Sequence, residues 1–321
     1  TLIQKNWDRI RLLFFIVKRL LMMIMTMLVV SLILFLVMEI NIESVAVKVL
    51  GQFSTDLQRE LWLEKHGYFR PTYIRYFGWL GNILQGSFGY SVVYKTEVGD
   101  LIWPRLKNTG ILAGLTLGVV VPLSILLGVL AGMREGSYRD RSISIVSIIS
   151  ASVPEFCSAT LIAWILVFSL HLLPGTSSFI SGFSWAEMVM PVLVLVLYDF
   201  GYITRMTRAS MAEVMQSQYI RTAQLKGLPF RRVIFRHALR NALIAPFTVI
   251  MLQLPWLLSG VIVTEYFFAY KGIGTLLLEA ALRQDVYLLE ACTMFLVAVA
   301  VGTQAISDIG YMLLNPKIRF K

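Results

Sequence analysis

The sequence predicts an all-α, polytopic membrane protein with six transmembrane helices. Three observations lead to this prediction: the composition, six long apolar stretches and an uneven distribution of Lys and Arg. Apolar residues make up 57% of the 321 residues and charged residues only 15%, and the mean hydropathy is +0.71. An average soluble domain has about 45–50% apolar and about 25% charged residues. The composition therefore excludes a disordered chain, a fibrous repeat and an ordinary cytosolic enzyme.

Each of the six apolar stretches is long enough to cross a bilayer. A helix rises about 1.5 Å per residue, so about 30 Å of hydrocarbon requires about 20 mostly apolar residues. The first stretch follows a basic flank, as in a signal peptide, but it is too long for a typical signal peptide. No A-x-A-like cleavage site follows it, so it is predicted to be retained. The six predicted spans are residues 12–38, 108–133, 143–173, 186–205, 243–264 and 287–314.

Lys and Arg residues gather on one side of these spans. Nineteen of the 29 lie in the N-terminal flank, the second-to-third connection, the fourth-to-fifth connection and the C-terminal segment. The first loop on the other side has eight, but seven Asp and Glu residues nearly neutralise them. By the positive-inside rule, this asymmetry predicts that both termini are cytoplasmic. It also explains the net charge of +10 without a nucleic-acid partner.

Two connections are long enough to form structure of their own. Residues 39–107 combine helix-compatible stretches with glycines, which predicts a small folded cap on the periplasmic side. Residues 206–240 have a helical pattern broken at 227–229, which predicts two short cytoplasmic helices around a sharp corner. The predicted segments are 1–38 (N-terminal segment and first span), 39–107 (cap) and 108–321 (a five-helix core that includes loop 206–240).

Glycines recur every four residues in the second predicted span. Gly110, Gly114 and Gly118 form one such series, and Gly128 and Gly132 form another. Small residues at this spacing allow helix backbones to approach closely. Both series therefore predict helix–helix packing.

Asp199 is the most deeply placed ionisable residue of the predicted spans. A carboxylate inside a membrane is costly unless it is paired or hydrated, so it is a functional candidate by default. Tyr198-Asp199 is similar to one half of an intramembrane aspartyl protease, which needs a second carboxylate within reach. The nearest sequence to the expected partner motif, at 272–275, contains no Asp. A proteolytic centre is therefore not predicted.

The sequence lacks three common catalytic and nucleotide-binding motifs. HExxH, GxSxG and the P-loop pattern GxxxxGKS/T are all missing, and the three histidines are scattered. Cys157 and Cys292 lie in apolar runs, which argues against a disulfide framework or a metal site. The chain is predicted not to be an enzyme and to hold no metal or cofactor. Any ATP that drives it would be hydrolysed by another polypeptide.

The predicted inner loop carries residues that resemble a known family. Residues 219–227, YIRTAQLKG, and 236–243, RHALRNAL, resemble the EAA loop of ABC-importer permeases, most of all the dipeptide, oligopeptide and nickel branch. Ala223 and Gly227 match the EAA signature, whereas Arg221 and Thr222 replace its Glu and first Ala, as is usual in this branch. The likeness extends over nearly the whole chain, through residues 76–91, 105–109, 136–141, 152–156, 204–211 and 315–319.

The resemblance implies a type I ABC-importer permease fold and a subunit that forms half of a translocation path in a bacterial inner membrane. The implied partners are a second homologous permease, two ATP-binding subunits that hold ATP and Mg, a periplasmic or lipid-anchored binding protein, and membrane lipid. The residues implied to couple the path to the ATP-binding subunits are Tyr219, Arg221, Thr222, Ala223, Lys226 and Gly227.

Alternatives remain open for the cargo and for the role. Peptides or similar small solutes are the first expectation, and a chelated metal such as nickel is an alternative within the same family. A membrane scaffold or receptor subunit without a transport path is a second alternative. A secondary transporter would show an inverted repeat and paired ions at mid-membrane, and the sequence shows neither.

Overall fold

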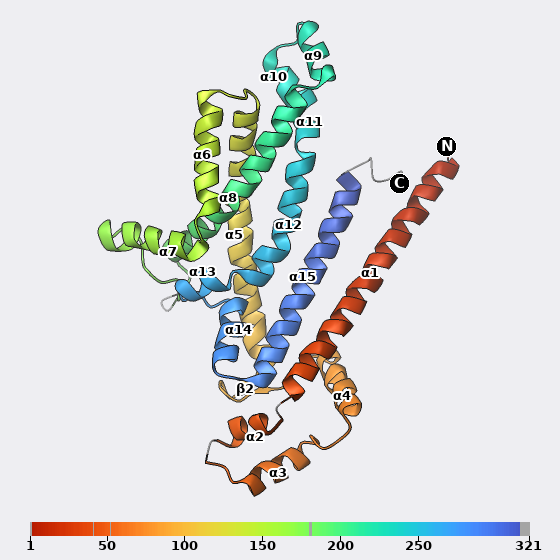
Figure 1. Cartoon of the computed structure of the whole chain (residues 1–321), viewed down its shortest axis with the longest axis vertical. Coiled ribbons are helices and arrows are strands. Elements are labelled where there is room, and N and C mark those ends of the chain that lie inside the picture. The colour runs from red at the N-terminus through yellow and green to blue at the C-terminus, as the bar shows by residue number, and fades with distance from the viewer. Residues whose placement is uncertain (1, 41, 52, 180–181, 315–321) are drawn as a thin grey trace. The chain divides into compact units, whose positions relative to one another are not determined.

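The computed structural model is almost entirely helical (Figure 1). It describes residues 2–40, 42–51, 53–179 and 182–314. Among these residues the only strands are a short antiparallel pair, β1 (Tyr90–Ser91) and β2 (Thr96–Glu97). The longer helices are α1 (Leu2–Glu39), α5 (Val98–Gly132), α6 (Tyr138–Ser152), α8 (Trp185–Met215), α12 (Ile244–Gly260) and α15 (Val286–Leu314). The shorter ones are α2 (Ile42–Leu50), α3 (Asp56–Lys65), α4 (Thr72–Leu84), α7 (Glu155–Ala163), α9 (Gln218–Leu225), α10 (Phe230–Arg232), α11 (Leu239–Ala242), α13 (Ile262–Phe267) and α14 (Ile273–Leu282), with two π-helical segments, η1 (Trp164–Ser169) and η2 (Val233–Ala238).

Among the described residues, four unbroken helices are long and apolar enough to cross a membrane, which confirms the predicted class. They are Ile16–Val37 within α1, α5, α8 and the Val286–Gly310 part of α15. Two bent pairs raise the number of spans to six if each pair counts as one. The helices also extend past several predicted ends. α5 begins ten residues before position 108, and α8 continues ten residues beyond position 205.

The third predicted span, residues 143–173, is not one straight helix. Helix α6 ends at Ser152, and the pair Glu155–Ser169 continues at an angle of 104°. Proline removes a backbone donor and pushes the residue before it out of the helical region. Val153, which precedes Pro154, is accordingly extended, with φ −88° and ψ 124°. The apolar run is continuous through this break, so composition alone predicted a single helix.

A second bend lies where the inner loop meets the fifth predicted span, residues 243–264. The helical stretch Phe230–Ala242 meets Ile244–Leu258 at an angle of 46°. The predicted second helix of the inner loop runs past the loop's predicted end at 240 to Ala242, through α10, η2 and α11. A π-helical turn such as η2 inserts extra backbone into a helix and disturbs its regular hydrogen bonding.

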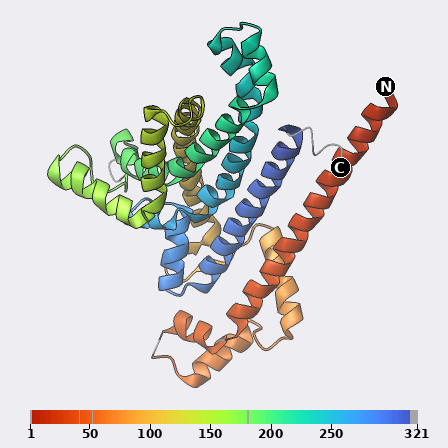
Figure 2. The ribbon, with the colours of Figure 1, turned by 45° about the horizontal axis from the view of Figure 1, so that its top comes forward.

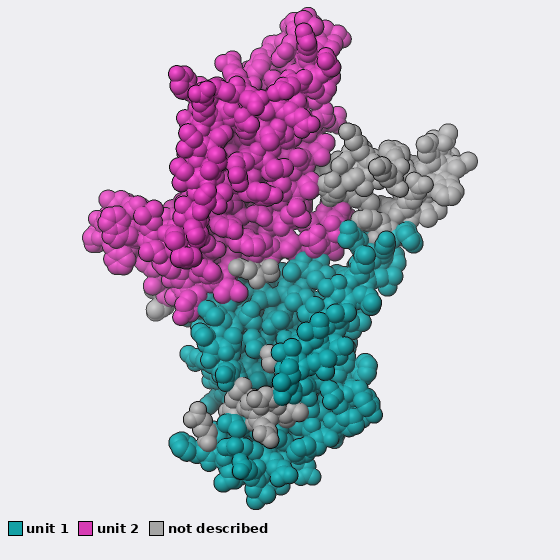
Figure 3. All heavy atoms as spheres, in the orientation of Figure 1, with its two compact units in different colours: residues 1–109, 271–302 teal, residues 110–270, 303–321 magenta. Residues whose placement is uncertain are grey.

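The chain forms two compact units, coloured separately in Figure 3. Unit 1 contains residues 1–109 and 271–302, and unit 2 contains residues 110–270 and 303–321. This division cuts across α5 and α15 and differs from the predicted segments 1–38, 39–107 and 108–321. Those segments concern the sides of a membrane and stay predictions.

Unit 1 includes the predicted cap, which is folded as expected. Helices α3 and α4 occupy the two stretches predicted to be helical. Thr55 begins α3 with a capping box, in which its side chain and that of Gln58 each accept from the other's backbone N–H. The core of this unit lies between the start of α5, α14 and the first part of α15, and includes Ile102, Leu276 and Leu288.

Unit 2 is built around close contacts of α8 with α5 and α6. A Cβ added to Gly132 would lie 2.6 Å from the Arg208 carbonyl oxygen, and one added to Gly201 would lie 2.2 Å from the Ser147 carbonyl oxygen. Gly128 is similarly close to α8, so the packing predicted for Gly128 and Gly132 is confirmed. At Gly110, Gly114 and Gly118 no described residue lies within 4 Å of an added Cβ, so helix packing at these three positions stays a prediction.

Candidate functional site

The loop at 206–240 is a compact helical corner. Helix α8 continues to Met215, the chain turns at Ser217, and α9 and α10 follow around a second turn. Figures 1 and 2 show α9 and α10 as the tip of unit 2, beyond the end of α8. The predicted arrangement of a helix, a corner and a second helix is therefore confirmed.

One face of α9 is anchored to the rest of unit 2. Ile220 is fully buried and Ala223 is 7% exposed. Both belong to a core cluster that includes Val129 of α5, Met211 of α8 and Val233 of η2. A helix of eight residues is too short to be stable alone, so this burial holds it in place. The predicted site residue Ala223 thus points into the protein.

The opposite face of α9 is open to solvent. Arg221, Thr222 and Lys226 are exposed, as is Tyr219. The Tyr219 hydroxyl accepts a hydrogen bond from the Asn241 side chain at 2.9 Å, which ties α9 to α11. Among the described residues, no ion pair is recorded for Arg221 or Lys226. The structure therefore displays four of the six predicted residues together.

Leu225 is an exposed apolar residue on this helix that the sequence analysis missed. Its side chain is 81% exposed, the highest value among the large apolar side chains of the 206–240 loop. A single exposed leucine has no special sequence pattern. Its only signal was its place in a basic segment between Arg221 and Lys226, where an apolar side chain is unusual.

The corner after α9 depends on Gly227. Its φ is +73°, a left-handed value that residues with a side chain adopt at a cost. Its N–H donates to the Gln224 carbonyl at 2.9 Å, and the Leu228 N–H donates to the Ala223 carbonyl at 3.4 Å. These two bonds form a Schellman motif, which satisfies the last carbonyls of a helix. Leu228 packs on the same core cluster as Ala223, completing the motif.

Arg208 connects α8 to the turn before α6. Its guanidinium forms two hydrogen bonds with the Asp140 carboxylate, at 2.9 and 2.8 Å, and pairs with Glu135 at 3.3 Å. Asp140 also accepts from the Gly136 N–H at 2.8 Å, and Ser137 caps α6. A bidentate pair of this kind fixes geometry as well as charge. In the sequence, Arg208 stands out only as one of the basic residues predicted on the inner side.

Asp199 is fully buried in α8 and bonded to an amide. Its Oδ1 accepts a hydrogen bond from the Gln253 side chain at 2.7 Å, and its Oδ2 has no hydrogen-bond partner among the described residues. Within the described part of the chain, no three His, Cys, Asp or Glu residues gather in a way that could hold a metal ion.

The family model for the inner membrane component of binding-protein-dependent transport systems matches residues 124–320. The chain is 32% identical over 313 residues to the oligopeptide transport system permease protein AppB of Bacillus subtilis, covering 95% of this chain and 99% of that protein. It is 32% identical over 309 residues to a putative peptide transport system permease protein of Brucella abortus, covering 95% and 98%. It is 31% identical over 310 residues to the metal-staphylopine import system permease protein CntB of Staphylococcus aureus, also covering 95% and 98%.

These matches cover both compact units, and the family model includes the whole helical corner at 206–240. The apolar helices agree with a multi-pass protein of the inner membrane. The chain belongs to the family of inner membrane components of binding-protein-dependent transport systems, and it is a permease subunit.

Proposed function

We propose that this permease forms half of the translocation path of an ABC importer for peptides or similar small solutes. Support comes from its similarity, over nearly its full length, to permeases named for oligopeptide and peptide transport. The similarity to a metal-staphylopine permease supports the alternative cargo, a chelated metal. A chelate would need no cluster of metal-binding side chains on this chain.

The remaining partners follow from the same proposal. A second homologous permease would complete the path, two ATP-binding subunits would hold ATP and Mg, and a binding protein would deliver the cargo from outside. The chain itself would need no cofactor. The basic residues of loop 206–240 support a cytoplasmic position for this loop and for both termini.

The anchored, Schellman-capped helix α9 is the observation that best supports the proposal. Its buried face is fixed to α5 and α8, so a force applied to α9 would move these helices with it. Its exposed face offers Arg221 and Lys226 to an acidic cleft and Leu225 to an apolar pocket. Closure of two ATP-binding subunits could then be transmitted as a rigid-body movement of the spans.

The test is reconstitution of the transporter with and without its partners. The purified chain alone should neither bind nor hydrolyse ATP. Co-expressed with its partner subunits and placed in proteoliposomes, it should support ATP-dependent peptide uptake that requires the loaded binding protein. ATP hydrolysis by the chain free of partners would refute the proposal. A receptor or scaffold role would instead give an assembled complex without uptake.

A further inference from the structure

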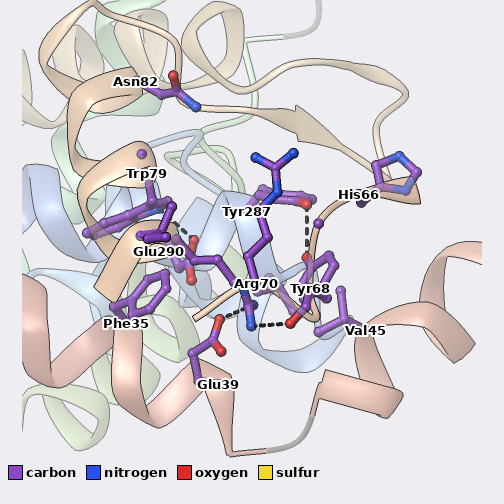
Figure 4. Close-up of a pocket in the computed structure, with 15 residues that line it drawn as sticks. Phe35, Glu39, Val45, His66, Tyr68, Arg70, Trp79, Asn82, Tyr287 and Glu290 are labelled. Carbon is purple, nitrogen blue, oxygen red and sulfur yellow. Dashed lines mark hydrogen bonds and ion pairs between the residues drawn. The ribbon is translucent and has the colours of Figure 1, made fainter. Parts of the chain in front are cut away.

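Unit 1 contains a cavity of about 340 Å³, shown in Figure 4. It is lined by the end of α1, Val45 of α2, the segment 66–70, α4 from Ile74 to Asn82 and the start of α15. A cavity of this size is at the small end of the range for ligand sites. Besides His66, four of the lining side chains are aromatic and two are carboxylates. These residues are Phe35, Tyr68, Trp79 and Tyr287, together with Glu39 and Glu290.

One of the two carboxylates, Glu39, already has a cation beside it, and that cation also lies over an aromatic ring. The Arg75 guanidinium pairs with Glu39, lies 4.5 Å from the centre of the Tyr68 ring and donates to the Tyr68 carbonyl at 2.9 Å. Attraction to a negative aromatic face and to a carboxylate together is a common way to hold an ammonium or guanidinium group. Burial raises the pKa of Tyr68, and its hydroxyl, bonded to that of Tyr287 at 3.1 Å, stays protonated.

The other carboxylate, Glu290, also lies beside aromatic rings, but no cation is paired with it among the described residues. Glu290 is 6% exposed, and its Oε2 accepts a hydrogen bond from the neutral Trp79 indole at 3.0 Å. Phe35 lies against Trp79, with ring centroids 5.6 Å apart. None of the ion pairs recorded among the described residues includes Glu290. A buried carboxylate without a counter-charge is costly, and a ligand cation would remove that cost.

Basic groups on the rim of the cavity do not take this role. Arg70 and His66 also line the cavity, but both are exposed, so solvent and salt screen any charge that they carry. Glu290 instead lies on the inner side near Trp79, as Figure 4 shows. The cavity therefore has a screened basic rim and, at its wall, a buried carboxyl group for which no counter-charge is found among the described residues.

We propose that this cavity binds a small protonated primary amine, with Glu290 as its counter-ion and the aromatic rings around its apolar part. The chemistry fits the free N-terminus of a small peptide, so this inference names part of the cargo and rests on the proposed function. A lysine side chain of a partner protein has the same charged group, and the experiment separates the two.

The probes are L-leucinamide, which carries the amine, and N-acetyl-L-leucinamide, which has the same apolar side chain without the charge. Binding is measured by calorimetry on the assembled transporter in lipid nanodiscs, without ATP or binding protein. Leucinamide should bind saturably and the acetylated probe should not. Glu290→Gln should weaken leucinamide binding about tenfold or more, because glutamine is nearly the same size as glutamate but carries no counter-charge for the amine. Glu64→Gln, on the exposed surface of α3, is the matched control and should bind like wild type.

A second pair of variants decides the question if Glu290→Gln does not assemble. Gly78 and Gly81 both lie in α4, and a Cβ at either position meets nothing within 4 Å, but only Gly78 lines the cavity. Gly78→Leu should fill the cavity and abolish binding, whereas Gly81→Leu should leave it unchanged.

Equal binding of the two probes, or wild-type binding by both Glu290→Gln and Gly78→Leu, would overturn this inference. A failure of leucinamide to bind would also overturn it. In a separate sample to which the binding protein is added, a cross-link from the cavity to a lysine of that protein would then assign the site to the partner protein. These outcomes leave ATP-driven uptake untouched. The proposed function fails separately, through loss of that uptake while leucinamide still binds.

Discussion

Gly227 is the residue where local backbone geometry and the proposed coupling meet. A β-branched side chain at φ +73° would cost about 1–2 kcal/mol, and the Schellman bonds that end α9 would weaken with it. Gly227→Val should therefore leave the protein inserted in the membrane but reduce co-purification of the ATP-binding subunits, uptake and stimulated ATP hydrolysis. Gly227→Asn is the control, because asparagine tolerates the left-handed region. Full recovery of partners and full uptake with Gly227→Val would mean that this corner does not matter for coupling.

Arg221 tests the charge of the exposed face of α9. Reversing an exposed charge at a docking surface weakens association and makes the remaining association more sensitive to salt. Arg221→Glu should lower recovery of the ATP-binding subunits, with a steeper loss as salt rises, while Arg221→Lys should behave nearly like wild type. Pull-down at several salt concentrations measures both. An effect on membrane insertion alone would show that Arg221 serves only as a positive-inside anchor.

At the scale of elements, the glycines of α5 give a matched test of helix packing. Leucine at Gly132 would place its Cβ 2.6 Å from both the Arg208 carbonyl oxygen and the Met211 Cβ, so α5 and α8 would have to separate. Overpacking of this kind costs about 1–3 kcal/mol. Gly132→Leu should lower the thermal unfolding temperature of the chain in detergent, and Gly114→Leu, with open space around it, should not. Equal unfolding temperatures for the two variants would contradict the close contact of α5 with α8.

Much of this architecture could be predicted from the sequence, and the errors have physical causes. Apolar length located all six span regions, and the Gly227–Pro229 break located the corner. Proline at 154 predicts a kink inside the third span, but the size of the bend, 104°, does not follow from the sequence, because the run remains apolar on both sides of it. The open surface around Gly114 could not be predicted from the spacing of the glycines. This spacing shows that close helix packing is possible, but it does not show which helix, or which subunit, supplies the partner.

The candidate site could be predicted in part. Four of the predicted residues are exposed on or next to α9, and Gly227 makes the turn, but the burial of Ala223 follows from the position of α5 and α8. The Arg208–Asp140 pair joins residues 68 positions apart, a contact that one sequence without relatives does not reveal. Leu225 was missed because exposure depends on what the fold leaves uncovered.

For the whole molecule, the charge asymmetry predicts the membrane sides. Cys157 is exposed and Cys292 is buried, so a Cys157→Ser background leaves little native thiol to label. A cysteine at the exposed Ser87 should then react with an impermeant thiol reagent in intact cells, and a reporter fused to the C-terminus should be cytoplasmic. Labelling of position 87 only after the membrane is permeabilised would reverse the orientation.

The central claim is that α9 is where this permease meets the ATP-binding subunits. The most direct measurement is site-specific photo-cross-linking in the assembled, transport-active complex, with the probe at Thr222 on the exposed face of α9. A probe at Leu84, 80% exposed at the end of α4 in the cap, is the control. We predict that position 222 cross-links to an ATP-binding subunit and that position 84 does not. A complex that transports normally, yet gives no cross-link from position 222 to those subunits, would contradict the account.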